Sequence, residues 1–271
     1  MTLKTISIAI LGCASACTAL SVSATDNADA AETTINPAHI ARSAKDPTER
    51  LAALRALQDP AVFAATALED ESIEVREFAV TRLDDQAVLA VVARIDRAEE
   101  IRAAAAERLH HAQILAQIAL RDASDYVRES AVQNIDDQAL LGEIALNDGS
   151  DAVRESAVAR LDDQTILATL AAAEPGSDVG LTALGRLTDQ RALGELARNG
   201  ATGYVRVMAV EKLRDPATLA DVALRDPSEH VRKAAVEQLT DAALLADIAR
   251  RDTSMYVRNV AGAVAVRLAK P

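Results

Sequence analysis

Apolar residues recur along this chain with a period of 26 residues. In residues 127–152, one apolar group is Val127, Ala131, Val132 and Ile135, and a second is Leu140, Leu141, Ile144 and Ala145. Each group follows the spacing of one helix face rather than the alternation of a strand. A fixed period in this range is typical of arrays in which each unit buries its apolar face against its neighbours. We therefore expect an all-α fold, a right-handed α-solenoid of about eight two-helix units over residues 46–271.

The dipeptide Val-Arg marks most units, and alanine holds one position in each of the two helices of a unit. The marker valines are Val75, Val127, Val153, Val205, Val231 and Val257, and Ile101 and Val179 occupy the same position in the remaining units. The alanine of the Val-Arg helix recurs from Ala53 to Ala261, and that of the other helix from Ala67 to Ala249. A position that is always alanine predicts a helix crossing too close for a larger side chain.

Aspartates are placed where a helix begins. One column precedes the second apolar group of each unit and consists of Asp59, Asp85, Asp137, Asp163, Asp189, Asp215 and Asp241. Aspartate at this place predicts an N-cap, and Pro60 and Pro216 follow two of the aspartates at the first helical position. His111 occupies the same column in one unit and predicts a weaker cap there.

A second aspartate column lies six residues before each arginine of the Val-Arg dipeptide. The pairs are Asp70/Arg76, Asp96/Arg102, Asp122/Arg128, Asp148/Arg154, Asp226/Arg232 and Asp252/Arg258. The resulting run, DxSxxVRxxAVxxL, resembles the HEAT repeat in its short bacterial, phycobilin-lyase-like form. This resemblance covers about four-fifths of the chain and implies a ladder of Asp–Arg hydrogen bonds and ion pairs that stacks each unit on the next. The short unit also approaches variant leucine-rich repeats, which alternate an α-helix with a 3-10 segment, so one helix per unit could be only two turns long.

Net charge excludes two classes of partner. The chain has 29 basic and 41 acidic residues, a net charge of −12, and no Trp. Nucleic acid and anionic lipid both require clustered positive charge, so neither is expected as a bulk partner.

Residues 1–24 have the pattern of a signal peptide. Lys4 gives a positive start, an uncharged apolar stretch follows, and Val22-Ser23-Ala24 provides the small residues that signal peptidase requires. Lipidation at Cys13 or Cys17 is the alternative and would tether the protein to the cell envelope, and an uncleaved anchor is the third reading. Residues 25–45 lack the repeat and are expected to be a disordered tether, in which Asn36-Pro37 can begin a short helix. We expect export, and simple cleavage favours a periplasmic location.

The sequence contains few residues in arrangements that could catalyse a reaction or bind a metal. Some HEAT-like proteins bind two irons through paired His-Glu motifs, but none of His39, His110, His111 and His230 is followed by Glu. His110 and His111 are adjacent and cannot share a helix face. Both cysteines lie in the leader, and the many carboxylates fall in the cap and ladder columns. Bilin lyase activity would rest on family analogy alone. We expect no catalytic residue, no metal and no cofactor.

Two sets of residues are not required by the repeat and are candidates for binding a protein partner. The residue before the Val-Arg dipeptide is Tyr126, Tyr204, His230 or Tyr256 in four units, and these include all three tyrosines. Tyr204, His230 and Tyr256 come from three consecutive units and predict an amphipathic stripe of the kind found in interfaces. Leu181, Val207 and Met208 replace polar residues at outward positions of the Val-Arg helices and predict an apolar contact site near this stripe. The alternatives are that each ring covers its own turn and that the apolar residues repair a badly packed unit.

The repeat is irregular around residue 176, and a basic column runs through the array. Glu174-Pro175-Gly176 replaces the usual Asp turn, Gly180 replaces the ladder Arg, and Gly200 replaces the next ladder Asp. Two adjacent rungs are therefore expected to be incomplete, through sequence drift or at a hinge.

A basic column lies at the end of the Val-Arg helices and consists of Arg82, Arg108, Arg160, Arg186 and Lys212. A favourable interaction with the dipole of the same helix explains this column, and binding of an acidic partner is the alternative. The sequence as a whole predicts an exported, non-catalytic protein-binding scaffold, with an envelope-tethered structural spacer or adaptor as the alternative.

Overall fold

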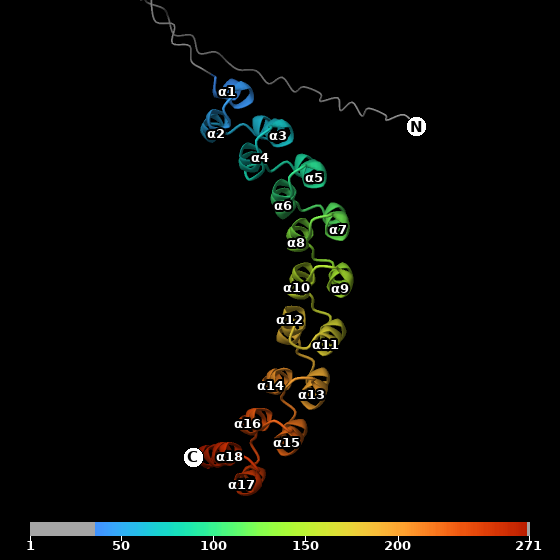
Figure 1. Cartoon of the computed structure of the whole chain (residues 1–271), viewed down its shortest axis with the longest axis vertical. Coiled ribbons are helices and arrows are strands. Elements are labelled where there is room, and N and C mark those ends of the chain that lie inside the picture. Colours follow the sequence, from blue (N-terminus) through green and yellow to red (C-terminus); the bar gives the residue numbers. More distant parts are fainter. Residues whose placement is uncertain (1–35, 270–271) are drawn as a thin grey trace, which may run out of the picture. The chain divides into compact units, whose positions relative to one another are not determined.

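The described part of the chain, residues 36–269 of a computed structural model, is built from α-helices alone. Figure 1 shows these helices stacked one after another in two layers. They are α1 (Pro37–Ser43), α2 (Pro47–Ala56), α3 (Pro60–Glu69), α4 (Ile73–Val80), α5 (Gln86–Ile95), α6 (Glu99–Glu107), α7 (Ala112–Arg121), α8 (Asp125–Val132), α9 (Gln138–Asn147), α10 (Asp151–Val158), α11 (Gln164–Ala173), α12 (Asp178–Arg186), α13 (Gln190–Asn199), α14 (Gly203–Lys212), α15 (Pro216–Arg225), α16 (Glu229–Gln238), α17 (Ala242–Arg251) and α18 (Met255–Leu268).

Each 26-residue unit contributes one helix to each layer. The Val-Arg dipeptide lies on the even-numbered helices, which form one layer, and the odd-numbered helices form the other (Figure 1). Each odd-numbered helix packs against the even-numbered helix that follows it, and most helices also pack against the next helix of their own layer. This arrangement is an α-solenoid. Both helices of the unit are α-helical, so no 3-10 segment takes the place of either one.

The core lies between the two layers and is made of the predicted columns. The marker residues from Val75 to Val257 and the alanines from Ala53 to Ala261 are buried, most of them completely. The second alanine column is buried from Ala67 to Ala223, and Ala249 is half-buried near the end of the array. Small side chains at these positions allow the helices to approach closely, which is why α2 to α17, each of eight to ten residues, can fill the core without Trp.

The predicted N-caps begin the odd-numbered helices. All seven aspartates of the column accept a hydrogen bond from a backbone N–H of the first turn, as Asp137 does from Ala139 and Leu140. His111 makes no such bond at the start of α7. The cap column is therefore confirmed, and so is the weaker cap at His111.

The first helix lies in the segment that sequence analysis assigned to a tether. α1 begins at the cap Asn36, whose side chain accepts from the N–H of Ala38, and its Ala41 is buried. Helical structure therefore begins before residue 46, because α1 covers the apolar face of the first unit. The predicted signal peptide, Cys13, Cys17 and the rest of the tether up to residue 35 lie outside the described residues. Within residues 36–269, no helix has the length and apolar character needed to cross a membrane.

Candidate functional site

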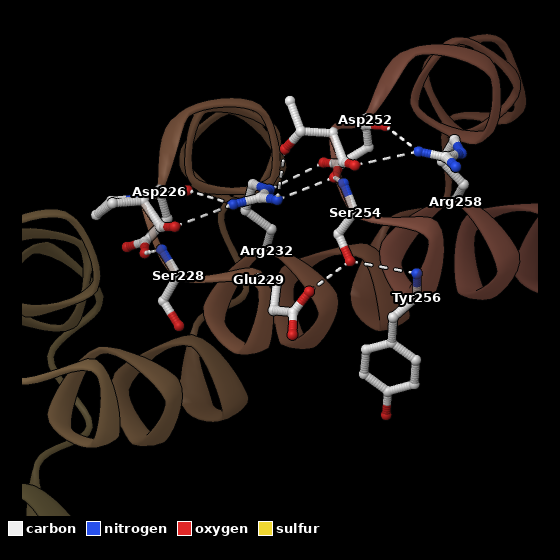
Figure 2. A network of polar contacts seen from close by, with 10 residues as sticks. Asp226, Ser228, Glu229, Arg232, Asp252, Ser254, Tyr256 and Arg258 are labelled. Atoms are coloured by element: carbon white, nitrogen blue, oxygen red, sulfur yellow. Dashed lines mark hydrogen bonds and ion pairs between the residues drawn. The ribbon is translucent and has the colours of Figure 1, made fainter.

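Each ladder arginine joins two consecutive units. Arg232 donates through Nε and Nη2 to the two carboxylate oxygens of Asp252, at 2.9 Å each, and through Nη1 to the carbonyl oxygen of Asp226 at 2.9 Å (Figure 2). The same bidentate ion pair recurs as Arg50–Asp70, Arg76–Asp96, Arg102–Asp122, Arg128–Asp148 and Arg206–Asp226. Arg258 donates to the carbonyl oxygen of Asp252 at 2.7 Å. The planar guanidinium fork matches this geometry better than an ammonium group would.

The pairing runs forward along the chain. An arginine binds the carboxylate of the aspartate in the following unit, whereas the aspartate six residues before it supplies only a carbonyl oxygen. Each carboxylate also accepts from the backbone N–H two residues later, as Asp122 does from Ser124 at 2.9 Å. The ladder therefore ties the turn of one unit to the turn of the next, in a nearly buried position.

Burial works against ionisation of Asp122, but it is outweighed by the hydrogen bonds from Arg102 and from the Ser124 N–H and by the charges of Arg102 and Arg128. The pKa of Asp122 is consequently held below its ordinary value. The same balance lowers the pKa values of Asp70 and Asp148. For Asp252 the hydrogen bond from Arg232 is the largest cause of a lowered pKa. These carboxylates are charged structural groups and are poor candidates for a general acid.

Two adjacent rungs are incomplete in the irregular region, as expected. One rung is missing, because Gly180 and Gly200 are twenty residues apart, the spacing of a rung, and both partners of the same ion pair are replaced together. The preceding rung is kept only in part: Glu174 accepts from Nη2 of Arg154 at 2.8 Å, but Nε of Arg154 is buried and makes no hydrogen bond within the described residues. The following rung, Arg206–Asp226, is complete.

Backbone occupies the space that a side chain at residue 180 would need. A Cβ atom on Gly180 would lie 2.0 Å from the carbonyl oxygen of Glu174, in the turn that contains Pro175 and Gly176. Gly176 has a φ of 95°, a left-handed conformation that favours glycine. The altered turn and the missing arginine are therefore parts of one local rearrangement.

The basic column forms a second ladder at the opposite end of the even-numbered helices. Arg160 donates through Nε to the carbonyl oxygen of Ile135 at 3.1 Å and pairs with Asp136 at 2.9 Å, both in the preceding unit. Arg108 and Arg186 bind the corresponding carbonyl groups of Leu83 and Leu161, and Lys212 binds the carbonyl oxygen of Leu184 near the end of α12. These side chains therefore also bind the end of the preceding even-numbered helix or the turn after it, a contact that the expected interaction with the dipole of their own helix did not include. Arg82 instead lies over the ring of Phe78, at 4.7 Å from its centroid.

Sequence analysis missed a third set of contacts, made by glutamines. Gln138 donates to the carbonyl oxygen of Arg160 at 3.2 Å and accepts from the N–H of Asp162 at 2.8 Å. Gln86 and Gln190 make the same two bonds to their following units, and Gln164 accepts from Thr188 and Asp189. The signal was available, because glutamine follows the cap aspartate at each of these four places.

The tyrosine column lies on the outer face of the even-numbered helices. Tyr204 is 60% exposed, Tyr256 is 47% exposed, and His230 between them is exposed. Tyr126 of the same column is 50% exposed. In Figure 2 the ring of Tyr256 points away from Arg232, Asp252 and Arg258. Lys233 pairs with Glu237 at 3.0 Å, and this hydrogen bond raises the pKa of Lys233, with a smaller contribution from Tyr256.

Leu181, Val207 and Met208 are half-buried on the same layer. Val207 and Met208 pack against the core. In the preceding units the equivalent positions carry polar pairs that cross the junction, Ser156 to Glu129 and Thr182 to Glu155, both at 3.1 Å. At the next junction, Leu181 and Met208 occupy these two places. Both members of the polar pair are therefore replaced by apolar residues at this junction. Packing between units thus explains the presence of Leu181 and Met208.

The remaining features are shallow clefts and dispersed acids. Clefts of about 260 to 410 Å³ lie beside the rungs between successive odd-numbered helices. Among the described residues, no three His, Cys, Asp or Glu side chains are grouped in a way that would hold a metal ion.

Comparison with known proteins places the fold. A solved structure described as a leucine-rich repeat variant with a novel repetitive structural motif superimposes with a TM-score of 0.62 at 24% identity, covering 76% of this chain and 81% of that one. The chain is an α-helical repeat protein. Escherichia coli YibA aligns with a TM-score of 0.44 at 17% identity, over 83% of this chain and 98% of that one. A designed armadillo repeat protein aligns with a TM-score of 0.20 at 21% identity, over 86% and 98%. No family model and no curated protein sequence matches this chain.

The phycobilin-lyase-like HEAT repeat thus remains a prediction from the motif. The leucine-rich repeat variant, which was the alternative, has a similar fold, but an identity below 25% says nothing about shared function.

Proposed function

We propose that this protein is an exported, non-catalytic scaffold that binds a protein partner through the outer face of α14, α16 and α18. The observation that carries the proposal is the exposure of Tyr204, His230 and Tyr256 in one column on three successive helices of one layer. Residues of one column lie in one row on a regular array. Tyrosine combines a large apolar area with a polar tip and loses little conformational entropy on binding, so it is enriched in interfaces.

Leu181, Val207 and Met208 extend this row with half-buried apolar area on α12 and α14. A binding surface of this composition has an apolar centre beside polar residues such as Lys233 and Glu237, which is the usual arrangement of a protein interface. The acidic balance of the chain makes a protein a better match than nucleic acid.

The absence of catalysis is proposed from what the acidic side chains do. Ladder aspartates are held by arginines and backbone N–H groups, and cap aspartates are held by helix N-termini. Each role fixes the carboxylate as a charged acceptor. Export is proposed from the pattern of residues 1–24, and a lipid anchor at Cys13 or Cys17, giving an envelope-tethered spacer or adaptor, is the alternative. Mass spectrometry of the mature N-terminus separates the two, because a lipidated protein would begin with a modified cysteine.

The binding proposal is tested by the double variant Tyr204→Ala/Tyr256→Ala in quantitative capture of proteins from a periplasmic extract. We expect a partner retained by the wild type to bind at least about tenfold more weakly, since a hot-spot tyrosine contributes more than about 1 kcal/mol. The melting temperature should stay within about 2 °C because both rings are exposed. Tyr126→Ala is the matched control, since Tyr126 is 50% exposed in the same column but has Ala152 and Asp178 as its following neighbours. Equal capture by all three proteins, or unfolding of the double variant, would refute the site.

A further inference from the structure

One junction of the odd-numbered layer shows how this array holds a carboxylate between two arginines. Asp221 of α15 lies 3.0 Å from Nη1 of Arg225 on the same helix and 3.5 Å from Nε of Arg198 at the end of α13. Arg198 also donates to Oγ1 of Thr218 at 2.6 Å. Two cations that converge from neighbouring units are thus neutralised by one acid of the chain.

The same two arginines recur four units earlier without the acid. Arg94 lies in the last turn of α5 and Arg121 ends α7, in the positions of Arg198 and Arg225, and Gln117 stands where the other junction has Asp221. Ile114 replaces Thr218. Within residues 36–269, neither Arg94 nor Arg121 forms an ion pair or a side-chain hydrogen bond, and both side chains are exposed.

A cleft of about 410 Å³ lies between these arginines. Its lining includes Arg94, Arg121, Gln117 and the apolar side chains of Ile95 and Ile118. Ile95 is 71% exposed, more than any other large apolar side chain in the described part of the chain. The charged residues on the cleft floor belong to completed rungs, Arg102 with Asp122 and Asp96 with Arg76, so they add no net charge. The cleft therefore carries a local excess of positive charge on an acidic protein.

Neighbouring clefts in the same register lack this excess. Between α7 and α9, Leu120 replaces the first arginine and Glu143 replaces Gln117. Between α15 and α17, Asp247 occupies the Gln117 position and pairs with both Arg250 and Arg251. The combination of two arginines with an uncharged residue between them is thus specific to the α5–α7 junction among these clefts.

We propose that the α5–α7 cleft binds an acidic segment of a protein partner, with an Asp or Glu side chain held between Arg94 and Arg121. An apolar residue next to that acid would cover Ile95. Charge complementarity carries the assignment, because the chain supplies the matching carboxylate itself at the equivalent junction and omits it here. This site is separate from the tyrosine row, which lies on the other layer, so either one can fail without the other. A purely local explanation is that both arginines interact with the C-terminal dipoles of α5 and α7.

The test exchanges the central residue between the two junctions in the full chain. Gln117→Asp recreates the internal arginine–carboxylate arrangement and should close the cleft to an external acid, whereas Gln117→Asn is the uncharged control of the same shape. Asp221→Asn should open the equivalent junction. The probe is a fluorescein-labelled nonapeptide with a central Leu-Glu in a Gly-Ser background, titrated by anisotropy at low salt because exposed ion pairs are screened. A second peptide carries Gln in place of Glu.

We expect the Glu peptide to bind the wild type and the Gln117→Asn variant alike, and to bind the Gln117→Asp variant at least about fivefold more weakly. The Gln peptide should bind at least about fivefold more weakly than the Glu peptide. The Asp221→Asn variant should gain binding capacity. In NMR spectra of the arginine side chains, the Nε–H signals of Arg94 and Arg121 should shift on titration of the wild type. No binding of the Glu peptide, equal binding by the two Gln117 variants, or equal binding of the two peptides would overturn the proposal and leave the helix dipole as the explanation.

Discussion

Arg128 and Asp148 are joined by two parallel hydrogen bonds of 2.9 Å, and the same guanidinium group donates to the carbonyl oxygen of Asp122 at 3.0 Å. Side-chain exposure is 16% for Arg128 and 9% for Asp148. One side chain therefore holds the turns of two consecutive units in a place that water hardly reaches. Removing one partner of such a pair is costly, because the other charge stays buried.

We predict that Arg128→Ala destabilises the array by about 3 kcal/mol, since it leaves the Asp148 carboxylate and the Asp122 carbonyl group without their donor. Arg82→Ala is the control. Arg82 is exposed and contacts only the ring of Phe78 among the interactions described, so its loss should cost less than about 1 kcal/mol. Urea denaturation followed by circular dichroism compares the two variants. Equal shifts in the midpoint would mean that the rung contributes no more than a surface contact.

Stability should fall in acid through the ladder carboxylates. The pKa values of Asp70, Asp122, Asp148 and Asp252 are lowered in the folded protein from an ordinary value of about 3.8. A group with a depressed pKa contributes stability above its unfolded value, and this contribution is lost as pH falls through the folded value. The urea midpoint should therefore decline below about pH 4. Asp122→Asn should lower stability at neutral pH and make the acid decline shallower, whereas Asp84→Asn, at an exposed site, should change neither.

Two glycines of α12 should respond in opposite directions to alanine. A Cβ atom at residue 180 would lie 2.0 Å from the carbonyl oxygen of Glu174, whereas one at Gly185 would meet nothing within 4 Å. Gly180→Ala should therefore destabilise the protein by more than about 1 kcal/mol, because backbone must move to make room. Gly185→Ala should stabilise it by up to about 1 kcal/mol, since alanine is the better helix former. Thermal melting of both variants checks this, and a neutral Gly180→Ala would show that the turn around Pro175 yields easily.

The glutamine contacts should contribute measurably to stacking. Gln138→Ala removes one bond to the carbonyl oxygen of Arg160 and another from the N–H of Asp162, and should cost about 1 to 2 kcal/mol. Gln113→Ala is matched in type and exposure, but Gln113 makes no hydrogen bond within the described part of the chain, so little change is expected. If both substitutions have the same effect in urea, the Gln138 contacts are exchanged for water without loss.

The columns that build the core could be read from the sequence because burial repeats with the same period as the residues. Val127, Ala131 and Ala145 were placed correctly by helical spacing alone. The cap aspartates were also predictable, since capping acts within a few residues of the same helix.

The direction of the polar contacts could not be read in this way. In a chain with a 26-residue period, the aspartate six residues before Arg128 and the one twenty residues after it belong to the same column. Periodicity identifies the residue types but leaves open which copy is the partner, and only the stacking of the units decides it. For the same reason Arg160 was matched only to its own helix, although it also binds the carbonyl oxygen of Ile135 in the preceding unit. The exposure of Tyr204 and the half-burial of Met208 likewise depend on neighbours that the column does not specify.

The absence of one rung at Gly180 and Gly200 has a consequence for the way the array folds. Ladder contacts run without interruption from Arg50 to Glu174 and from Arg206 to Asp252. In a one-dimensional chain of coupled units, cooperativity spreads only as far as the nearest-neighbour coupling stays strong. The junction of α12 with α14 is held by apolar packing and by Lys212, which donates to the carbonyl oxygen of Leu184 at 3.0 Å. We therefore expect the array to unfold as two cooperative blocks of unequal length, with the pair of glycines as the boundary at which unfolding of one block can stop before it enters the other.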